Sequence, residues 1–130
     1  MLTVILMLLV SVVSSSAFAE WMVLGVSNET KTNYVNPTTV RNADSRVKMW
    51  SLSDFKSIQV IAGRSFLSSK DQYEYDCEQR RARLLFFVNY SGNMGAGAVT
   101  LSSTVPAPDW DPIPPDTVLD QMWEFACGKK

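Results

Sequence analysis

The chain has 130 residues, with 12 Lys and Arg, 13 Asp and Glu and no His, so its formal net charge at pH 7 is −1. This size predicts one domain with a single core, and the balanced charge argues against a nucleic-acid-binding protein, which would carry a strong basic excess. The absence of His excludes Ser-His-Asp and Cys-His catalysis and every zinc site that needs a His ligand.

The N-terminal segment has the features of a signal peptide. Residues 1–19 carry no charge, and they begin with an apolar run from Leu2 to Val13. Ala17-Phe18-Ala19 then forms an A-x-A site, which predicts cleavage after Ala19. The run is too short for a transmembrane anchor, which needs about 20 residues. The cleavage site has no Cys, so the mature chain, residues 20–130, is expected in the periplasm or secreted, without a stable membrane anchor and not as an evident lipoprotein.

The two cysteines, Cys77 and Cys127, are expected to form a disulfide, because an exported protein matures in an oxidising compartment. A reactive thiol is the alternative. It lacks both a CxxC partner and a His that would activate it.

After residue 20, short apolar runs alternate with turn clusters, a pattern typical of an antiparallel sheet. The expected strands are 21–26, 33–35, 46–52, 72–77, 82–90 and 97–102. Alternation places Val47 and Met49 on one face of the third strand and Trp50 on the other. The stretch 54–70 is ambiguous, because it fits either an irregular excursion or a further strand around 58–62 that ends at Gly63.

The C-terminal part of the chain is predicted to be an extended connection followed by a helix. Residues 104–115 contain five of the six prolines, which excludes regular strand pairing there. Apolar residues then recur at helical spacing and predict a helix over 116–127, with Thr117 or Asp116 as its N-cap and Gly128 after its end. Cys127 lies in the last turn, so a disulfide would clamp the helix onto one sheet face. The predicted class is α+β, a single antiparallel sheet of about six strands with a C-terminal helix on one face.

The residues singled out for partner binding lie at the start of the strand 82–90. Arg80, Arg81 and Arg83 are either solvated or paired with Glu74, Asp76 and Glu78 of the neighbouring strand, or they form a binding patch. Alternation puts Leu85 and Phe87 on the face opposite the helix, where they are either covered by residues 54–70 or part of an interface with a protein partner or a second copy of the chain. These five residues form the predicted partner-binding site.

No other pattern predicts catalysis, a metal or a cofactor. The glycine-rich stretch 92–97 lies between two strands and lacks the Lys-Ser/Thr that follows a phosphate-binding loop. The aspartates of 109–120 lack the spacing of a calcium loop. We therefore expect a protein that is not an enzyme and binds neither metal nor cofactor.

Several short sequence elements follow one another along the mature chain: Trp21, Tyr34-Val35-Asn36-Pro37, Val47-Lys48-Met49-Trp50, Tyr75-Asp76-Cys77, Arg83, Gly95, Trp110, Pro115 and Trp123 to Gly128. In this order the chain resembles the bacterial surface-adhesin protein E family over residues 21–128. The resemblance implies a curved antiparallel sheet with the C-terminal helix tied to its concave side by the disulfide. It also implies a non-enzymatic envelope or surface protein, and named members of the family bind host matrix proteins.

The expected function is therefore that of an exported, non-catalytic module of the bacterial envelope that binds a host matrix protein or an envelope protein. The alternative is an inhibitor or assembly partner of a periplasmic enzyme, which would need the same disulfide-held scaffold.

Overall fold

The computed structural model describes residues 20–27, 29–106 and 108–128. The predicted signal peptide, residues 1–19, lies outside the described residues.

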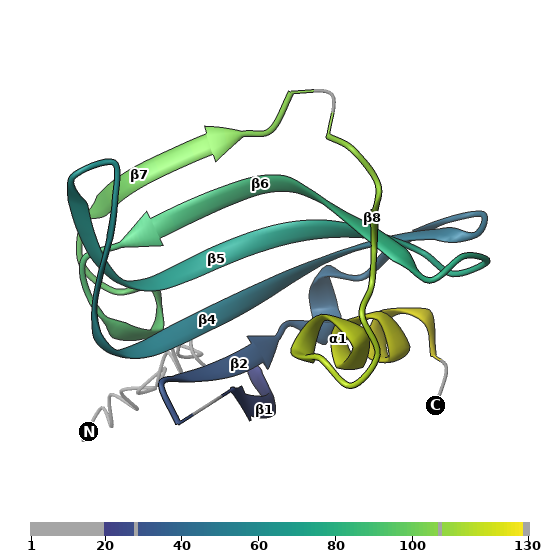
Figure 1. Ribbon diagram of the computed structural model, residues 1–130, viewed down its shortest axis with the longest axis horizontal. Coiled ribbons are helices and arrows are strands. Elements are labelled where there is room, and N and C mark those ends of the chain that lie inside the picture. Colours follow the sequence, from purple (N-terminus) through teal and green to yellow (C-terminus); the bar gives the residue numbers. More distant parts are fainter. Residues whose placement is uncertain (1–19, 28, 107, 129–130) are drawn as a thin grey trace, which may run out of the picture.

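One antiparallel sheet forms the body of the molecule, and its strands are paired in the order β1-β2-β4-β5-β6-β7 (Figure 1). The strands are β1 (Met22–Ser27), β2 (Lys31–Val35), β3 (Arg41–Ala43), β4 (Arg46–Ile61), β5 (Arg64–Asp76), β6 (Arg81–Tyr90), β7 (Val99–Thr104) and β8 (Asp111–Pro112). Two short 3-10 turns, η1 (Pro37–Thr39) and η2 (Asn93–Gly95), and the helix α1 (Val118–Cys127) complete the fold.

The predicted α+β class is confirmed, but the strand count is larger than expected. The two additional strands are β3, which pairs with β4, and β8, which pairs with β6 through Pro112 and Asp111. β8 lies inside the proline-rich segment that was predicted to contain no strand. Pro112 is the last residue of this two-residue strand at the edge of the sheet, so the absence of its backbone N–H destabilises the pairing only slightly.

The ambiguous stretch 54–70 is the tip of a long β4–β5 hairpin. The pairing of β4 with β5 shifts register between Asp54 and Gln59. From Gln59 it continues to the tip of the hairpin, where Ile61 pairs with Arg64. Ala62 and Gly63 both have positive φ, 53° and 72°, the conformation that a two-residue hairpin turn requires. The tip bends toward the far edge of the sheet (Figure 1), where the Arg64 guanidinium donates to the Thr100 carbonyl at 3.0 Å.

A bulge in β6 decides which face its side chains occupy. Gln72 pairs with Phe86, but Tyr73 pairs with Leu84, so Leu85 is an extra residue in the ladder. Simple alternation was therefore wrong beyond residue 84. Phe87 lies on the same face as Leu84, which is the face that carries the helix, and Phe86 lies on the opposite face with Arg83.

Helix α1 packs on one face of the sheet and encloses the main core. The core joins Val47, Met49 and Tyr75 of the sheet to Met122 and Trp123 of the helix. The Thr117 hydroxyl accepts the Asp120 N–H at 3.2 Å, and Gly128 ends the helix with a left-handed φ of 66°. The disulfide between Cys77 and Cys127 is confirmed, and it ties the last helical turn to the end of β5.

Candidate functional site: an aromatic pocket on the face opposite the helix

The face of the sheet that points away from α1, here called the opposite face, carries large aromatic side chains. Cross-strand pairing places Trp50 beside Gln72 and Gln72 beside Phe86, and the Trp50 and Phe86 rings meet edge to face at 5.9 Å. The next row joins Leu52, Lys70 and Val88. This part of the opposite face is thus mainly apolar, with Lys70 between Leu52 and Val88.

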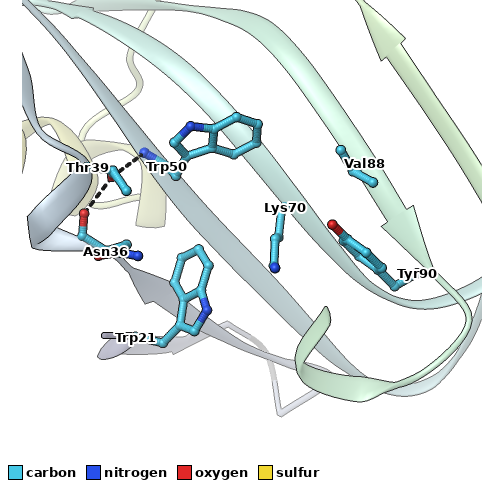
Figure 2. Close-up of a pocket in the computed structure, with 7 residues that line it drawn as sticks. All are labelled: Trp21, Asn36, Thr39, Trp50, Lys70, Val88 and Tyr90. Atoms are coloured by element: carbon cyan, nitrogen blue, oxygen red, sulfur yellow. Dashed lines mark hydrogen bonds between the residues drawn. The ribbon is translucent and has the colours of Figure 1, made fainter. Parts of the chain in front are cut away.

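A pocket of about 240 Å³ opens on this face, and Figure 2 shows the side chains that line it. Trp21, Trp50 and Tyr90 form its aromatic sides, and Lys70 points between Trp21 and Tyr90. The Lys70 ammonium lies 5.8 Å from the Trp21 ring centre and 5.1 Å from that of Tyr90, within cation–π range. Lys70 forms no ion pair with any residue that the structure describes.

The polar end of the pocket is held by backbone hydrogen bonds. The Thr39 hydroxyl donates to the Asn36 carbonyl at 2.6 Å and accepts the Trp50 N–H at 3.0 Å (Figure 2). The Asn36 N–H donates to the Trp50 carbonyl at 3.1 Å. These bonds fix η1 against β4, so the pocket is shaped before any ligand arrives.

The η2 turn packs against the side chain of Lys70. Gly95 has a φ of 74°, and a Cβ atom at this position would lie 2.7 Å from Lys70 Cε. The turn is anchored by Ser68, whose hydroxyl accepts the Gly95 N–H at 2.9 Å and donates to the Gly92 carbonyl at 2.6 Å. Gly95 therefore allows the turn to approach the lysine closely.

A second cluster on the opposite face stacks arginines on Trp110. The guanidinium carbons of Arg46, Arg81 and Arg83 lie 5.2, 4.7 and 4.2 Å from the centre of the Trp110 ring. Arg81 also pairs with Asp76 at 2.9 Å and Arg83 with Glu74 at 2.6 Å. The pairing interpretation of the arginines is therefore confirmed for Arg81 and Arg83, and Trp110 holds the proline-rich connection on the sheet.

The structure does not bring the five residues of the predicted partner-binding site onto one surface. Arg80 lies on the helix side, where it pairs with Asp120 at 3.2 Å and with Glu124 at 3.4 Å and stacks 4.6 Å from the Trp123 ring centre. Phe87 also lies on the helix side, and it lines a cavity with Phe55, Ile61 and Phe66 from the 54–70 stretch.

Residues of the 54–70 stretch therefore lie next to Phe87, and the other possibility, an interface, stays a prediction. Leu85 stands at the bulge, half-buried. Partner binding by the five residues stays a prediction.

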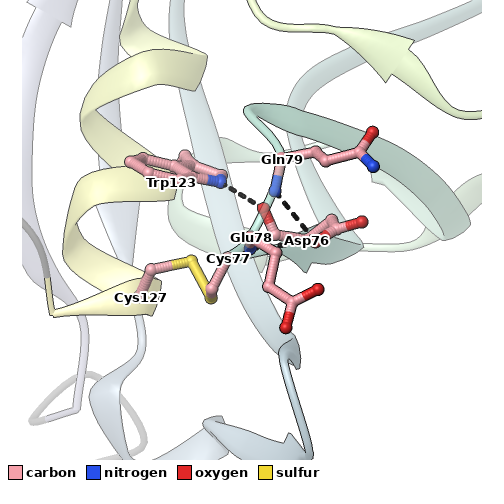
Figure 3. The surroundings of a disulfide bond; sticks show 6 residues. All are labelled: Asp76, Cys77, Glu78, Gln79, Trp123 and Cys127. Carbon is pink, nitrogen blue, oxygen red and sulfur yellow. Dashed lines mark hydrogen bonds between the residues drawn. A yellow bond between two sulfur atoms is a disulfide. The ribbon is translucent and has the colours of Figure 1, made fainter.

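The turn after β5 is organised by Asp76 (Figure 3). One oxygen of its carboxylate accepts the N–H groups of Glu78 and Gln79 at 3.0 and 3.1 Å, and the other accepts from Arg81. Its backbone carbonyl accepts the Trp123 indole N–H at 2.7 Å. Desolvation raises the pKa of the carboxyl, but the hydrogen bonds from Gln79, Arg81 and Glu78 and the charge of Arg81 outweigh it, so the pKa of Asp76 lies below its usual value.

This lowered pKa predicts that Asp76 stabilises the fold at neutral pH and loses this effect in acid. Because the folded pKa is the lower one, the stabilisation is complete above the unfolded value of about 3.9 and disappears as the pH falls through the folded pKa. In urea unfolding, Asp76→Asn should be less stable than the original protein at pH 7, and the difference should shrink below about pH 4. Exposed Asp109→Asn is the control. A difference that stays constant between neutral and acidic pH would contradict the assignment.

The described part of the chain has neither a metal-binding cluster nor a membrane-spanning helix. Residues 20–27, 29–106 and 108–128 contain no cluster of three or more Cys, Asp or Glu side chains suited to a metal ion. The same residues include no helix of the length and apolar character needed to cross a membrane.

Reasoning from the sequence missed the aromatic pocket. Trp21, Trp50 and Tyr90 come from the segment before β1, from β4 and from β6, and only the cross-strand register brings them together. The alternation around Trp50 did place its side chain away from the core, and this was the available signal. In the sequence, the concentration of charge indicates the arginines. Lys70 belongs to no cluster of basic residues, so the charge pattern does not indicate it.

The fold and the pocket define a small, disulfide-tied sheet protein with an open surface pocket. The model of the surface-adhesin protein E family matches residues 21–128, and the chain belongs to this family. A comparison with curated protein sequences gives no match.

Solved structures of protein E from Haemophilus influenzae share the fold. Two of them, one being crystal form II, each have a TM-score of 0.62 and 14% sequence identity and cover 85% of this chain, and the match spans 88% and 85% of those chains. A structure of protein E from non-typeable Haemophilus influenzae matches with a TM-score of 0.56 and 14% identity, over 85% of this chain and 76% of that one. The expected resemblance and the predicted fold are thereby confirmed.

Proposed function

We propose that this protein is exported and acts as a non-catalytic protein-binding module, which contacts a bacterial envelope protein or a host matrix protein through the opposite face of its sheet. Membership in the surface-adhesin protein E family supports a role in adhesion. The proposal places the main contact at the aromatic pocket around Lys70.

The observation that carries the proposal is an unpaired ammonium between tryptophan and tyrosine rings in an open pocket. Trp, Tyr and Arg are enriched among the residues that dominate protein–protein binding energy, because they bury a large apolar area and still offer a polar contact. A carboxylate of the partner, next to an apolar side chain, would pair with Lys70 while the apolar group fills the space between the rings.

Arg81 and Arg83 belong to the proposed contact surface as its rim. Their charges are already paired with Asp76 and Glu74, and stacking on Trp110 limits their movement. A partner carboxylate would meet guanidinium groups whose orientation is fixed before binding, which reduces the entropy lost on association.

The test compares binding by the original protein and by variants of the pocket. The immobilised protein is exposed separately to purified host matrix proteins and to solubilised envelope proteins of the source cell, and each captured partner is then titrated. Lys70→Glu and Tyr90→Ala should each weaken binding about 10-fold or more, the effect of losing a central contact. Lys56→Glu, on the exposed part of the β4–β5 hairpin, is the matched control and should leave the affinity unchanged.

Binding that survives both pocket substitutions together, in a protein that still melts at its original temperature, would contradict the pocket as the contact site. Failure to bind any protein in either arm would contradict the function itself. A partner found only among the envelope proteins would assign a role within the source cell and would exclude adhesion to a host.

A further inference from the structure

The helix-bearing face of the sheet holds a row of polar side chains where an apolar core would be expected. Cross-strand pairing joins Asn33 to Ser53, Ser53 to Ser69 and Ser69 to Asn89, so the row crosses β2, β4, β5 and β6. The neighbouring row pairs Ser51 with Asp71. Helix α1 covers the face on one side of these rows, and the bent β4–β5 hairpin borders it on the other (Figure 1).

Two adjoining cavities lie over these rows, and we call them together the polar trough. The larger, about 310 Å³, has Phe55, Phe66 and Phe87 among its apolar walls and Asn89 among its polar ones. The smaller, about 150 Å³, lies between Asn33 and the first turns of α1. Lys31, Ser53 and Asp71 line both cavities. Sites for small molecules usually begin at about 300 Å³, and they combine apolar walls with a few convergent polar groups.

The two asparagines of the polar trough have buried donors without a partner. Asn33 and Asn89 are 1% and 2% exposed, and the side-chain amide nitrogen of each has no hydrogen-bond partner. A buried donor left unpaired destabilises a fold, so nearly all such groups in proteins are paired with protein atoms, water or a ligand. Asn33 lines the smaller cavity and Asn89 the larger one, so each cavity has one such donor in a residue of its wall, which could donate to an acceptor that enters.

Lys31 and Asp71 add one charge of each sign to the polar trough. Neither forms an ion pair with any residue in the described part of the chain. The Asp71 carboxylate accepts the Ser69 hydroxyl at 2.9 Å. Desolvation raises the pKa of Asp71, although the Ser69 hydrogen bond and the charge of Lys31 both lower it. A cation bound beside Asp71 would relieve this cost of burial.

The apolar end of the polar trough is suited to an aromatic or branched side chain. The rings of Phe55 and Phe66 meet edge to face at 5.7 Å and form a preformed wall. Leu84 and Phe87 of β6 line the same cavity. The phenylalanine walls thus belong to the larger cavity, next to the polar groups that line both cavities.

We propose that the polar trough is a binding site for a free α-amino acid with a large apolar side chain. The ligand carboxylate would accept from Lys31 and from the Asn33 amide on the same strand, its ammonium would donate to Asp71, and its side chain would fill the space between Phe55, Phe66 and Phe87. This site lies on the helix side of the sheet, away from the aromatic pocket around Lys70, so it is independent of the protein-binding function proposed above.

The experiment titrates the full mature chain, labelled for NMR, with L-phenylalanine and L-leucine. Backbone signals of β5 and β6 around the polar trough should shift and saturate with a Kd of about 1 mM or tighter, which is within reach of a ligand of this size. Phenethylamine lacks the carboxylate and 3-phenylpropionate lacks the ammonium, and each should bind about 10-fold more weakly than L-phenylalanine because it leaves one charge of the site unpaired.

Two substitutions assign the head-group contacts. Asp71→Asn should weaken the binding of L-phenylalanine about 10-fold without weakening that of 3-phenylpropionate. Lys31→Met should weaken the binding of both acids without weakening that of phenethylamine. Asp71→Asn is expected to fold, because burial already disfavours the charged carboxylate. Lys48→Met, an exposed position on the opposite face, is the control and should change nothing.

Three results would overturn the proposal: no saturable shift with either amino acid, shifts that do not map to the polar trough, or equal affinity for L-phenylalanine and phenethylamine. A change of partner binding at the aromatic pocket would have no bearing on it.

Discussion

Replacing Trp123 with alanine is expected to lower the free energy of unfolding by about 3 to 5 kcal/mol, the usual cost of deleting a large buried aromatic side chain. Trp123 is 6% exposed and stands at the centre of the contact between α1 and the sheet. Its indole N–H donates to the Asp76 carbonyl at 2.7 Å, so the substitution also leaves a buried carbonyl without this donor. Urea or guanidinium unfolding, followed by far-UV circular dichroism, measures the effect.

Trp123→Phe separates the hydrogen bond from the packing. It keeps most of the apolar volume and should cost about 1 to 3 kcal/mol, the penalty for a buried acceptor left unpaired. Trp110→Ala is the matched control on the opposite face, where the ring is half-buried and stacks on arginines, and it should cost less than Trp123→Ala. If the alanine variants at positions 110 and 123 were equally destabilised, the view of Trp123 as the centre of the core would be wrong.

The second large effect is expected for the disulfide. Replacing Cys77 and Cys127 together with serine should lower the free energy of unfolding by about 2 to 4 kcal/mol, because the cross-link restricts the unfolded chain. Calorimetry on the double variant and on the oxidised original protein measures the loss.

The disulfide and Trp123 hold the same turn of the sheet to the same helix, as Figure 3 shows. We therefore expect their effects to be coupled, so that Trp123→Ala costs more in the absence of the disulfide than in its presence. Additive losses would indicate that the two contacts act independently.

The sequence predicted the parts of the fold that depend on local patterns. The alternation of residues 46–52 placed Val47 and Met49 in the core and Trp50 on the other face, and pairing confirms this. The helical spacing of residues 118–126, with Thr117 before it and Gly128 after it, gave the helix to within two residues of its start. Both patterns repeat over several residues, so each is set by the sequence next to it.

Features that depend on extra residues inserted into one strand of a pair were not predictable. The bulge at Leu85 moves Phe87 to the helix side, and nothing in the run from Leu84 to Val88 marks the position of the extra residue. The same applies to the register shift after Asp54, which lets the hairpin tip bend over Phe87. Each shift reverses the faces of all the residues that follow it in the strand.

Of the proposed contact surface, only the charged rim with Arg81 and Arg83 was predictable from the sequence. Pairing of the arginines with acidic residues of the neighbouring strand was one of the interpretations that the sequence allowed, and the structure pairs Arg81 with Asp76 and Arg83 with Glu74. The grouping of Trp21, Trp50 and Tyr90 around Lys70 depends on the register of strands that are distant in sequence. The same is true of the polar row from Asn33 to Asn89, whose members lie on four different strands.

The position of α1 has a consequence for the order in which the chain can fold. The sheet is a meander in which β4, β5, β6 and β7 each follow their neighbour directly, so these hairpins can form soon after synthesis. Strand β1 is covered by α1, because Gly25 of β1 lies against Gln121 of the helix. Since α1 is the last element of the chain, β1 stays uncovered until the helix has formed. Val35, Met49 and Tyr75 therefore stay uncovered until this helix docks on the sheet. During this interval the nascent sheet is exposed to aggregation, and the final helix ends that exposure in a single docking step.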